Sequence, residues 1–523
     1  MTGCDGDNPP IPATECDALA ALYTATDGLN WDVDTDWTTS ADPCTWHGVT
    51  CTDGNVTGLD LSANGLTAPV PADIVDLTEL ATLDLSGNGC LHTAGDLITA
   101  DWVTALDATW DVCPVEDVLA ALYASTDGPN WLVDTNWLTD PDVCTWAGIT
   151  CDGTVVEEIE LYANNLAGPI PHEIRSLTTL TNLAIYDNAI TAIPNEIAYS
   201  TSLKFLNAGD NVLTALPAGI GSLDALVSLD LAENGITALP DEIGDLASVT
   251  NLDLTRNDVG ALPATVGNLD TLLTLGMYDN QLTVLPDEIG DMAVLNNLNV
   301  GNNQLNGLPA TVTNLAPTLQ SLYLHQNPLG SVPVEVLSLT NLRNLTLGSG
   351  SLTSLPAGMA ALVNLEYLSL SINQLTSLPS WIGDLTALDT LNANSNQLTS
   401  LPTEIGNLVN LQFLNLSYND LTTLPTSIGN LTGVQYVQLQ GNDLSALPAE
   451  FGSLTALLDL DLRYNLLLDD ISAWASGLHA ADTLTTLEIG DGVGRNTCLN
   501  DGGDSSLGAW LEALDPTWND ECS

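Results

Sequence analysis

Hydrophobic residues recur with a fixed period over most of the chain. From residue 156 onward a unit of 23 residues repeats, as in LVSLDLAENGITALPDEIGDLAS (226–248) and LQFLNLSYNDLTTLPTSIGNLTG (411–433). The shared pattern is L-x-x-L-x-L-x-x-N-x-L-T-x-L-P-x-x-I-G-x-L-x-x, and units start at residues 156, 180, 203, 226, 249, 272, 295, 319, 342, 365, 388, 411, 434 and 457. A period of this length predicts a stack of structural repeats.

Each unit predicts one short strand followed by a turn. The x-L-x-L-x segment buries alternate side chains, and one such strand per repeat builds a parallel sheet. The Asn at the ninth position, which recurs from Asn188 to Asn465, can hydrogen-bond to the backbone of the neighbouring turn and form a ladder. Gly350 interrupts this series, so we expect a locally looser turn there. The later Pro and Gly suit a tight turn with a short helical segment.

Two segments that could close the open ends of such a stack each occur twice. ALAALYTATDGLNWDVDTDWTTSADPCTWHGVTC (18–51) returns as VLAALYASTDGPNWLVDTNWLTDPDVCTWAGITC (118–151), and CLHTAGDLITADWVTALDATWDVC (90–113) parallels the end of the chain, CLNDGGDSSLGAWLEALDPTWNDEC (498–522). Because exposed ends leave a sheet edge and leucine core in water, these segments predict caps. The predicted parts are a tether (1–17), a short capped module with two repeats (18–113), a second N-terminal cap (114–155), a long stack of about fourteen repeats (156–483) and a C-terminal cap (484–523).

The repeat pattern resembles the leucine-rich-repeat family, and the P-x-x-I-G-x-L ending resembles its bacterial and plant-like variants. The segments 18–51 and 118–151 resemble the N-terminal caps of plant receptors and bacterial surface proteins. This resemblance implies an α/β fold, a leucine-rich-repeat solenoid. The expected shape is a curved horseshoe with a parallel concave sheet and disulfide-bonded caps.

The cysteines and charges limit the environment and the partners. The ten cysteines form short-range pairs that suggest disulfides and an oxidising compartment: Cys4 with Cys16, Cys44 with Cys51, Cys90 with Cys113, Cys144 with Cys151, and Cys498 with Cys522. The alternative for Cys4 is a bacterial lipoprotein anchor, because Thr-Gly-Cys resembles the end of such a signal. With 67 acidic and six basic residues the net charge is -61, which disfavours nucleic acid and anionic membranes. No apolar run reaches the length of a membrane span.

Motifs for catalysis and metal binding are missing from the sequence. It contains no G-x-S-x-G, H-E-x-x-H or P-loop, so we expect a protein that is not an enzyme and has no cofactor. The acidic stretch DVDTD (32–36) has the alternating carboxylates of a calcium loop but lacks the following Gly and the terminal Glu. We interpret it as a solvated cap loop and predict no metal site, with Ca²⁺ kept as an alternative.

The concave face is the predicted binding surface. Eight of the eleven tyrosines fall on its positions, as do four of the six cations, Lys204, Arg256, Arg343 and Arg463. Over residues 295–456 these positions hold only two acids, Glu366 and Asp389. Aromatic, Arg and amide side chains are enriched in binding surfaces. Two patches are predicted to bind the ligand: Tyr323, His325, Arg343 and Tyr367 in the first, and Phe413, Tyr418, Tyr436, Gln438, Arg463 and Tyr464 in the second.

These observations favour a secreted or cell-surface recognition protein, of bacterial origin, that binds a protein or polysaccharide ligand through this face. The alternative is a structural or adhesive surface component whose acidic outer face is bridged by calcium.

Overall fold

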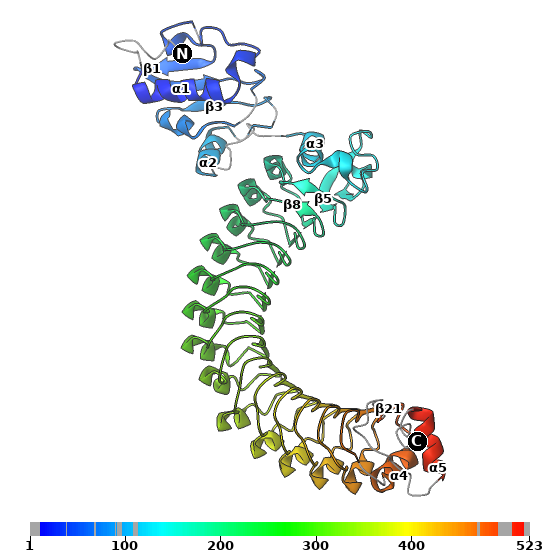
Figure 1. The fold of residues 1–523 in the computed structure, drawn as a ribbon. Helices are drawn as coiled ribbons and strands as arrows, with labels where there is room; N and C mark the ends of the chain where they lie inside the picture. Colours follow the sequence, from blue (N-terminus) through cyan, green and yellow to red (C-terminus); the bar gives the residue numbers. More distant parts are fainter. Residues whose placement is uncertain are drawn as a thin grey trace. The chain divides into compact units, whose positions relative to one another are not determined.

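The computed structural model describes residues 11–37, 39–66, 69–88, 90–91, 97–107, 113–467, 471–489 and 505–516. The chain divides into two compact units, residues 1–252 and 253–523. In each unit, strands lie on one side of the repeats and short 3₁₀ helices on the other (Figure 1). No helix in the described ranges has the length and apolar character needed to cross a membrane.

The first hundred residues form a short module around its own core. Its elements are α1 (Ala13–Ala25), η1 (Gly28–Asn30), η2 (Pro43–Thr45), β1 (Val49–Thr52), β2 (Asn55–Asp60), η3 (Ala72–Asp76), β3 (Thr82–Asp84) and α2 (Leu97–Leu106). Strand β1 pairs antiparallel with β2, which pairs in parallel with β3. The parallel pair β2 and β3 lies in the segment for which two repeats were predicted.

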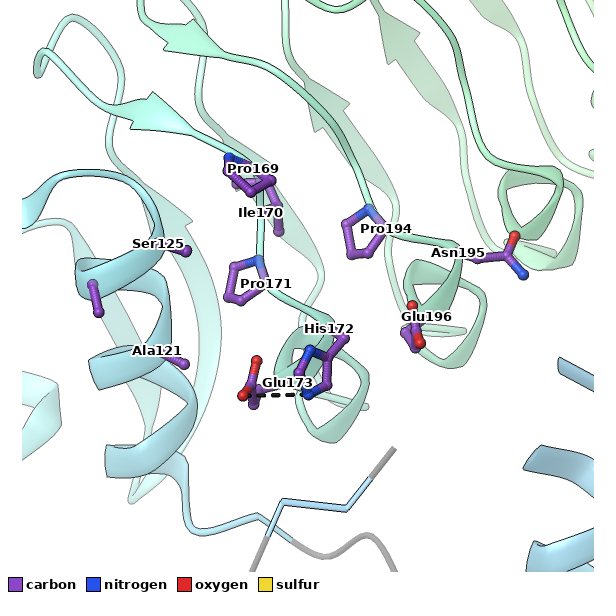
Figure 2. A pocket seen from close by; sticks show the side chains of 11 residues that line it. Ala121, Ser125, Pro169, Ile170, Pro171, His172, Glu173, Pro194, Asn195 and Glu196 are labelled. Atoms are coloured by element: carbon purple, nitrogen blue, oxygen red, sulfur yellow. Dashed lines mark ion pairs between the residues drawn. The ribbon is translucent and has the colours of Figure 1, made fainter. Parts of the chain in front are cut away.

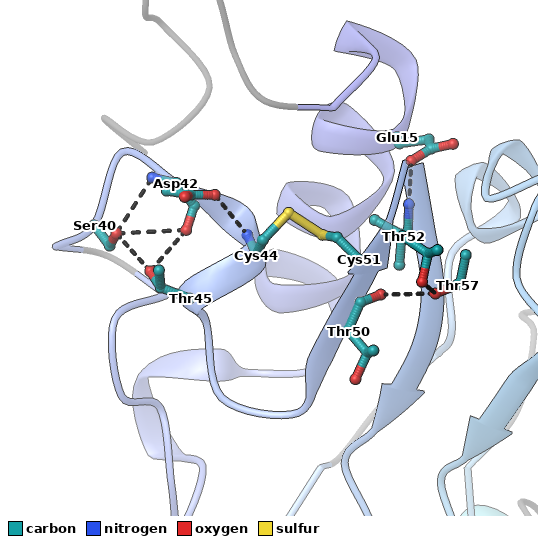
Figure 3. Close-up of a disulfide and its surroundings, with 10 residues drawn as sticks. Glu15, Ser40, Asp42, Cys44, Thr45, Thr50, Cys51, Thr52 and Thr57 are labelled. Atoms are coloured by element: carbon teal, nitrogen blue, oxygen red, sulfur yellow. Dashed lines mark hydrogen bonds between the residues drawn. A yellow bond between two sulfur atoms is a disulfide. The ribbon is translucent and has the colours of Figure 1, made fainter. Parts of the chain in front are cut away.

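Helix α1 begins earlier than the predicted boundary at residue 18. Cys16 is fully buried, and the Glu15 carboxylate accepts a hydrogen bond of 2.8 Å from the backbone N–H of Val56 (Figure 3). These contacts make residues 13–17 part of the cap, so the predicted tether of residues 1–17 was too long. The boundary was misplaced because a helix start at Pro12–Ala13 carries no capping side chain.

The second module contains the long sheet. Its N-terminal part comprises α3 (Val115–Ser125), η4 (Gly128–Asn130), η5 (Val143–Thr145), β4 (Ile149–Asp152), β5 (Val155–Glu160), β6 (Ala167–Gly168), η6 (His172–Ser176), β7 (Asn182–Ala184) and β8 (Ala189–Ile190). The strands that follow are β9 (Phe205–Asn207), β10 (Ser228–Asp230), β11 (Asn251–Asp253), β12 (Thr274–Gly276), β13 (Asn297–Asn299), β14 (Ser321–Tyr323), β15 (Asn344–Thr346), β16 (Tyr367–Ser369), β17 (Thr390–Asn392), β18 (Phe413–Asn415), β19 (Tyr436–Gln438), β20 (Asp459–Asp461) and β21 (Thr486–Glu488). The sheet order runs from β21 back to β9, then β7, β5 and β4, while β6 and β8 pair separately.

The predicted turn of each repeat is a 3₁₀ helix that begins after a proline. These helices are η7 (Asn195–Tyr199), η8 (Ala218–Ser222), η9 (Asp241–Asp245), η10 (Ala264–Asn268), η11 (Asp287–Asp291), η12 (Ala310–Leu315), η13 (Val334–Ser338), η14 (Ala357–Ala361), η15 (Ser380–Asp384), η16 (Thr403–Asn407), η17 (Thr426–Asn430) and η18 (Ala449–Ser453). Proline suits the residue before the first turn because its fixed φ is already compatible with a helix start.

The three-residue strands bury their middle side chain in the core, and their first and third side chains lie on the other side of the sheet, where many are half-buried or buried. Leu322, Leu345 and Leu368, which pair in register on β14, β15 and β16, are fully buried. The residue directly after each strand, such as Leu324 or Leu347, is also buried, whereas the first and third strand residues and the second and third residues after the strand lie on the opposite side. We call the surface they form the strand face.

The predicted asparagine ladder is present. Asn373, for example, donates to the carbonyl of Leu347 at 2.9 Å and accepts from the N–H of Leu352 at 2.9 Å. At the interruption, the N–H of Gly350 donates to Asn373 Oδ1 at 3.0 Å, and its carbonyl accepts from Gly330 at 2.9 Å. The expected loosening is therefore not seen in the backbone hydrogen bonds of this turn.

The two terminator segments share one capping interaction. Helix α2 ends before Asp107, whose carboxylate accepts from the N–H of Leu85 at 2.6 Å, and α5 (Ser505–Leu514) ends before Asp515, which accepts from Ile489 at 2.7 Å. In both cases a side chain satisfies the backbone just after the last strand. The sheet itself extends into the predicted C-terminal cap, because α4 (Ser472–Ala481) and β21 form one more, irregular repeat.

The structure confirms three predicted disulfides, Cys44–Cys51 (Figure 3), Cys90–Cys113 and Cys144–Cys151. Cys16 is also disulfide-bonded. Cys4, Cys498 and Cys522 lie outside the described residues, so their pairing and the lipid alternative for Cys4 stay predictions.

Candidate functional site

A hollow of about 620 Å³ opens on the strand face over β14–β17. We call it the strand-face hollow. Its lining residues are Tyr323, His325, Gln326, Asn344, Thr346, Gly348, Ser349, Tyr367, Ser369, Ser371, Ile372 and Asn392. This volume lies within the range of small-molecule sites in proteins.

Strand register explains how the predicted first patch contributes to this hollow. Tyr323 is the third residue of β14 and lies in register with Thr346 and Ser369, whereas Tyr367 is the first residue of β16. Tyr323 therefore lies in the same row as Thr346 and Ser369, whereas Tyr367 lies in the neighbouring row with Asn344. Three of the four residues predicted for the first patch, Tyr323, His325 and Tyr367, line the hollow.

His325 is held by three neighbours. Its ring stacks on Tyr278 with centroids 5.4 Å apart, and its Nδ1 lies 2.9 Å from Thr346 Oγ1. The ring also covers Gly301, where a Cβ would approach it to 2.5 Å. Burial lowers the pKa of His325 below its ordinary value of 6.5, because desolvation disfavours the charged imidazolium.

Arg343, the fourth residue of the first patch, has a different role in the structure. Its guanidinium donates to the carboxylate of Glu366 one repeat further on, and both side chains are about half exposed. It does not appear among the residues that line the hollow. An exposed ion pair of this kind contributes on the order of 0–1 kcal/mol, so we expect it to neutralise the rim more than to stabilise the fold.

From the sequence we predicted bulky side chains for this site. The small side chains that leave the hollow open were not predicted. Gly348 and Ser371 occupy the repeat position that carries Tyr278, His325 and Arg463 elsewhere. The signal was present in the segment GSGS (348–351), where a Gly replaces the ladder Asn. A gap between large neighbours is visible only when the residues at one repeat position are compared along the stack.

The predicted second patch also lies on the strand face, but two of its side chains, Gln438 and Arg463, contact acidic groups. Phe413 and Tyr436 are neighbours in register, with ring centroids 6.3 Å apart. Gln438 donates to Asp459 at 3.0 Å, while Tyr418 and Tyr464 remain exposed. The patch therefore combines free aromatic faces with an amide that is already engaged.

Arg463 is at the centre of this acidic group. Its guanidinium donates two hydrogen bonds to Asp461, at 3.0 and 2.6 Å, and forms an ion pair with Glu488 at 2.5 Å. The hydrogen bond to Asp461 raises the pKa of Arg463, while desolvation raises the pKa values of Asp459 and Glu488. Asp461 and Glu488 thus contact the guanidinium of Arg463, with Asp459 on the same strand as Asp461, and the second patch is charged where the lining of the strand-face hollow is not.

Comparisons with known proteins fit this architecture. Models described as a leucine-rich repeat region and as leucine rich repeats match residues 226–302, 317–398 and 410–431, and a leucine rich repeat N-terminal domain matches 13–52 and 116–152. A solved leucine-rich-repeat protein of Leptospira interrogans is 31% identical; the match covers 82% of this chain and 95% of that one, with a TM-score of 0.61. The chain belongs to the leucine-rich-repeat family.

Plant receptors are also similar to this leucine-rich-repeat chain. The plant peptide hormone receptor RGFR1, solved in complex with RGF2, is 28% identical over 87% of this chain and 68% of the receptor, with a TM-score of 0.52. The receptor-like protein kinase HSL1 of Arabidopsis thaliana is 32% identical over 14% of this chain. The chain covers only 8% of HSL1 and 11% of the BRASSINOSTEROID INSENSITIVE 1 protein.

A larger hollow, about 920 Å³, lies where the N-terminal cap of the long leucine-rich-repeat stack meets its first turns (Figure 2). Ala121 and Ser125 of α3 face Pro171, and the wall continues through η6 and η7 (Figure 2). The ion pair in the hollow joins sequence neighbours, His172 and Glu173, at 3.4 Å. Six of the eleven described residues that line it are Ala, Pro or Ile, and none of the eleven has a Tyr, Phe or Trp ring to pack against a ligand, which makes it the weaker candidate for specific recognition.

We expect the imidazole of His325 to titrate with a midpoint below 6.5 in the folded protein, because burial disfavours its protonated form. Between that midpoint and 6.5 the unfolded chain binds more protons, so folding stability should fall as the pH drops through this window. NMR titration checks this, and the His325→Gln variant identifies the resonance among the five histidines. A midpoint at or above 6.5 would show that the ring is more hydrated than the structure indicates.

Proposed function

We propose that this protein is a non-enzymatic, extracellular recognition protein that binds a protein or polysaccharide ligand through its strand face. The observation that carries the proposal is the strand-face hollow, where Tyr323, His325 and Tyr367 converge around small hydroxyl side chains. Aromatic walls with a few placed polar groups are typical of ligand sites. The hollow is also uncharged on a chain of net charge -61.

The similar plant receptors support recognition outside the cell. RGFR1 is described as a peptide hormone receptor and was solved with a bound partner, RGF2. Disulfide-bonded caps favour an oxidising environment, in agreement with secretion or display on a surface. Bacterial origin and a lipid anchor at Cys4 remain proposals, the first supported by the similarity to the Leptospira protein.

The second candidate is a calcium-bridged structural or adhesive component. Its support is the large excess of acidic residues, since divalent cations reduce repulsion between such surfaces. Within the described residues no group of three or more His, Cys, Asp or Glu side chains is placed to hold a metal ion. In this candidate, calcium would act between molecules. Calcium-dependent self-association in light scattering, together with failure to find a discrete ligand, would favour it.

Replacing Arg343 and Tyr367 together by Ala tests the strand face. Once a pull-down or glycan array has identified a ligand, we expect the double variant to weaken binding by about 2 kcal/mol or more, roughly 30-fold, as anchor truncations do. Calorimetry on the full chain measures the loss. Because Arg343 is paired with Glu366, the single Tyr367→Ala change should account for most of it.

Glu242→Lys, on the 3₁₀ helix η9, is the matched control for this double variant. Residue 242 lies away from the strand face, so the affinity of the Glu242→Lys variant for the ligand should equal that of the parent protein. If the double variant binds normally while Glu242→Lys abolishes binding, the ligand contacts the acidic turn surface instead.

A further inference from the structure

We propose that the strand-face hollow takes an uncharged sugar unit of a polysaccharide or glycoconjugate. This inference rests on the proposed function and specifies the chemistry of the ligand at the same site. It follows from the charge of the lining, from its hydrogen-bonding groups and from the arrangement of its flat side chains.

The described residues that line the hollow include no Asp, Glu, Lys or Arg. At the second position of the three neighbouring repeats stand Arg343 and Glu366, which are paired with each other, and Asp389, which does not line the hollow. An anionic ligand would find no free cation in the lining, and a cationic ligand would find no carboxylate. Burying a charged group without a partner is costly, so the hollow selects a neutral ligand.

The polar lining consists of groups that both donate and accept hydrogen bonds. Hydroxyls come from Thr346, Ser349, Ser369 and Ser371, and amides from Gln326, Asn344 and Asn392. Each hydroxyl has one donor and two acceptor sites, and each amide has both types. Sugar hydroxyls also both donate and accept. Each can therefore form a hydrogen bond with a lining hydroxyl or amide in either direction.

Capacity for further hydrogen bonds remains in this lining. Thr346 is engaged with His325 at 2.9 Å, and Ser369 lies 3.3 Å from Ser371, the long end of the hydrogen-bond range. Asn344 donates to Ser321 at 3.0 Å and keeps its carbonyl oxygen for other contacts. These groups are oriented by the protein but not saturated by it.

Flat and apolar side chains complete the wall. Tyr323, Tyr367 and the imidazole of His325 present rings, and Ile372 is 59% exposed at the rim. The face of an aromatic ring carries negative charge density and attracts C–H groups, which a sugar ring displays on one side. The ring faces of the lining can therefore contact the C–H groups of a neutral sugar, while the lining hydroxyls and amides hydrogen-bond to its hydroxyl groups.

The extent of the hollow favours a compact ligand over an extended peptide. It covers four strands, β14–β17, which at a spacing of about 4.8 Å corresponds to roughly 15 Å. Farther along the same face the acidic group of Asp459, Asp461 and Glu488 begins. A peptide that extended from the hollow past β18 and β19 would reach this acidic group, whereas one or two sugar rings fit within the hollow.

Ser371→Trp is the variant that tests this inference, because its indole would occupy the hollow. The repeat accepts large residues at this position, since it holds Tyr278, His325 and Arg463 elsewhere. Ser371→Arg, the residue found at 463, is the second variant in case the indole disturbs folding. Ala232→Trp is the matched control, because Ala232 lies at the same repeat position beside Asp210, Asp230 and Glu233.

The full chain is passed over immobilised neutral polysaccharides (glucan, mannan and galactan), acidic ones (polygalacturonate and alginate) and a peptide library. We expect retention on at least one neutral polysaccharide and competition by its free monosaccharide. Ser371→Trp and Ser371→Arg should weaken this binding at least tenfold, and Ala232→Trp should change it less than twofold. Thermal unfolding of each variant confirms that the fold is intact.

The opposite outcomes separate the inference from the proposed function. Preference for the acidic polysaccharides, or binding only of a peptide that Ser371→Trp blocks, would overturn the sugar inference and leave strand-face recognition in place. A ligand whose binding is unchanged by Ser371→Trp, Ser371→Arg and Tyr367→Ala would overturn both.

Discussion

Replacing Trp137 by Ala should destabilise the N-terminal end of the long stack by about 3–5 kcal/mol, as loss of a fully packed aromatic side chain does. Trp137 is 4% exposed and lies 4.8 Å from Trp131 and 5.0 Å from Trp146, measured between ring centroids. Its indole N–H donates to the carbonyl of Ala147 at 2.9 Å. The substitution therefore leaves both a cavity and an unpaired carbonyl in the cap.

The effect should be local, because each repeat contacts only its neighbours. We expect hydrogen exchange to increase first in residues 115–184 and urea unfolding to lose cooperativity there. Leu132→Ala in the same cap is the control, since Leu132 is 72% exposed and should change stability by less than about 0.5 kcal/mol. Equal shifts in the two variants would show that the aromatic cluster does not hold the cap.

The Asn373→Ala variant should lower stability by roughly 3 kcal/mol or more, since each buried group left without a partner costs about 1–3 kcal/mol. The Asn373 carbonyl accepts from the N–H groups of Gly350 and Leu352, and its amide donates to the carbonyls of Leu347 and Leu370. Because residue 350 is a glycine, this repeat has no ladder amide of its own. Asn373 Oδ1 accepts from two N–H groups of one turn, as Asn88 Oδ1 does from Asn64 and Leu66.

Asn364→Ala is the control for this variant. Its amide also donates to a backbone carbonyl, that of Thr340 at 2.9 Å, but at an exposed position where water can replace it. Denaturant unfolding should show a large loss for Asn373→Ala and a small one for Asn364→Ala. Similar losses would mean that ladder amides contribute no more than surface ones. Residues 348–351 border the strand-face hollow, so we also expect Asn373→Ala to weaken ligand binding.

The sequence predicted which residues of the candidate site lie on one face of the sheet. It did not predict which of their side chains are already paired with other side chains of the protein. Repeat positions placed Tyr323, His325 and Tyr367 on one face, and the structure brings them to one hollow. The same reasoning nominated Arg343 and Arg463 as ligand anchors, but their guanidinium groups contact Glu366 and Asp461. Side-chain pairing, whether with the next repeat as in Arg343–Glu366 or within one repeat as in Arg463–Asp461, depends on rotamers and distances that a sequence pattern does not contain.

The sequence by itself determined the repeat, the parallel strands, the asparagine ladder and the doubled caps. Leucines spaced at two residues can be buried only as strands, and a period of 23 residues allows each strand to stack on the next in register. Cap segments were recognisable because an open end must be covered.

Only the tertiary structure decided where the strand face is hollow and where it is charged. The space over Gly348 and Ser371 exists because His325 lies back over Gly301 toward Tyr278, which is a contact between repeats. The charge of the second patch likewise depends on Arg463 contacting Asp461 of its own repeat and Glu488 of the neighbouring strand β21. Periodicity fixes the positions of residues along the stack, whereas the shape and charge of the surface arise from how side chains of different repeats fill the space between them.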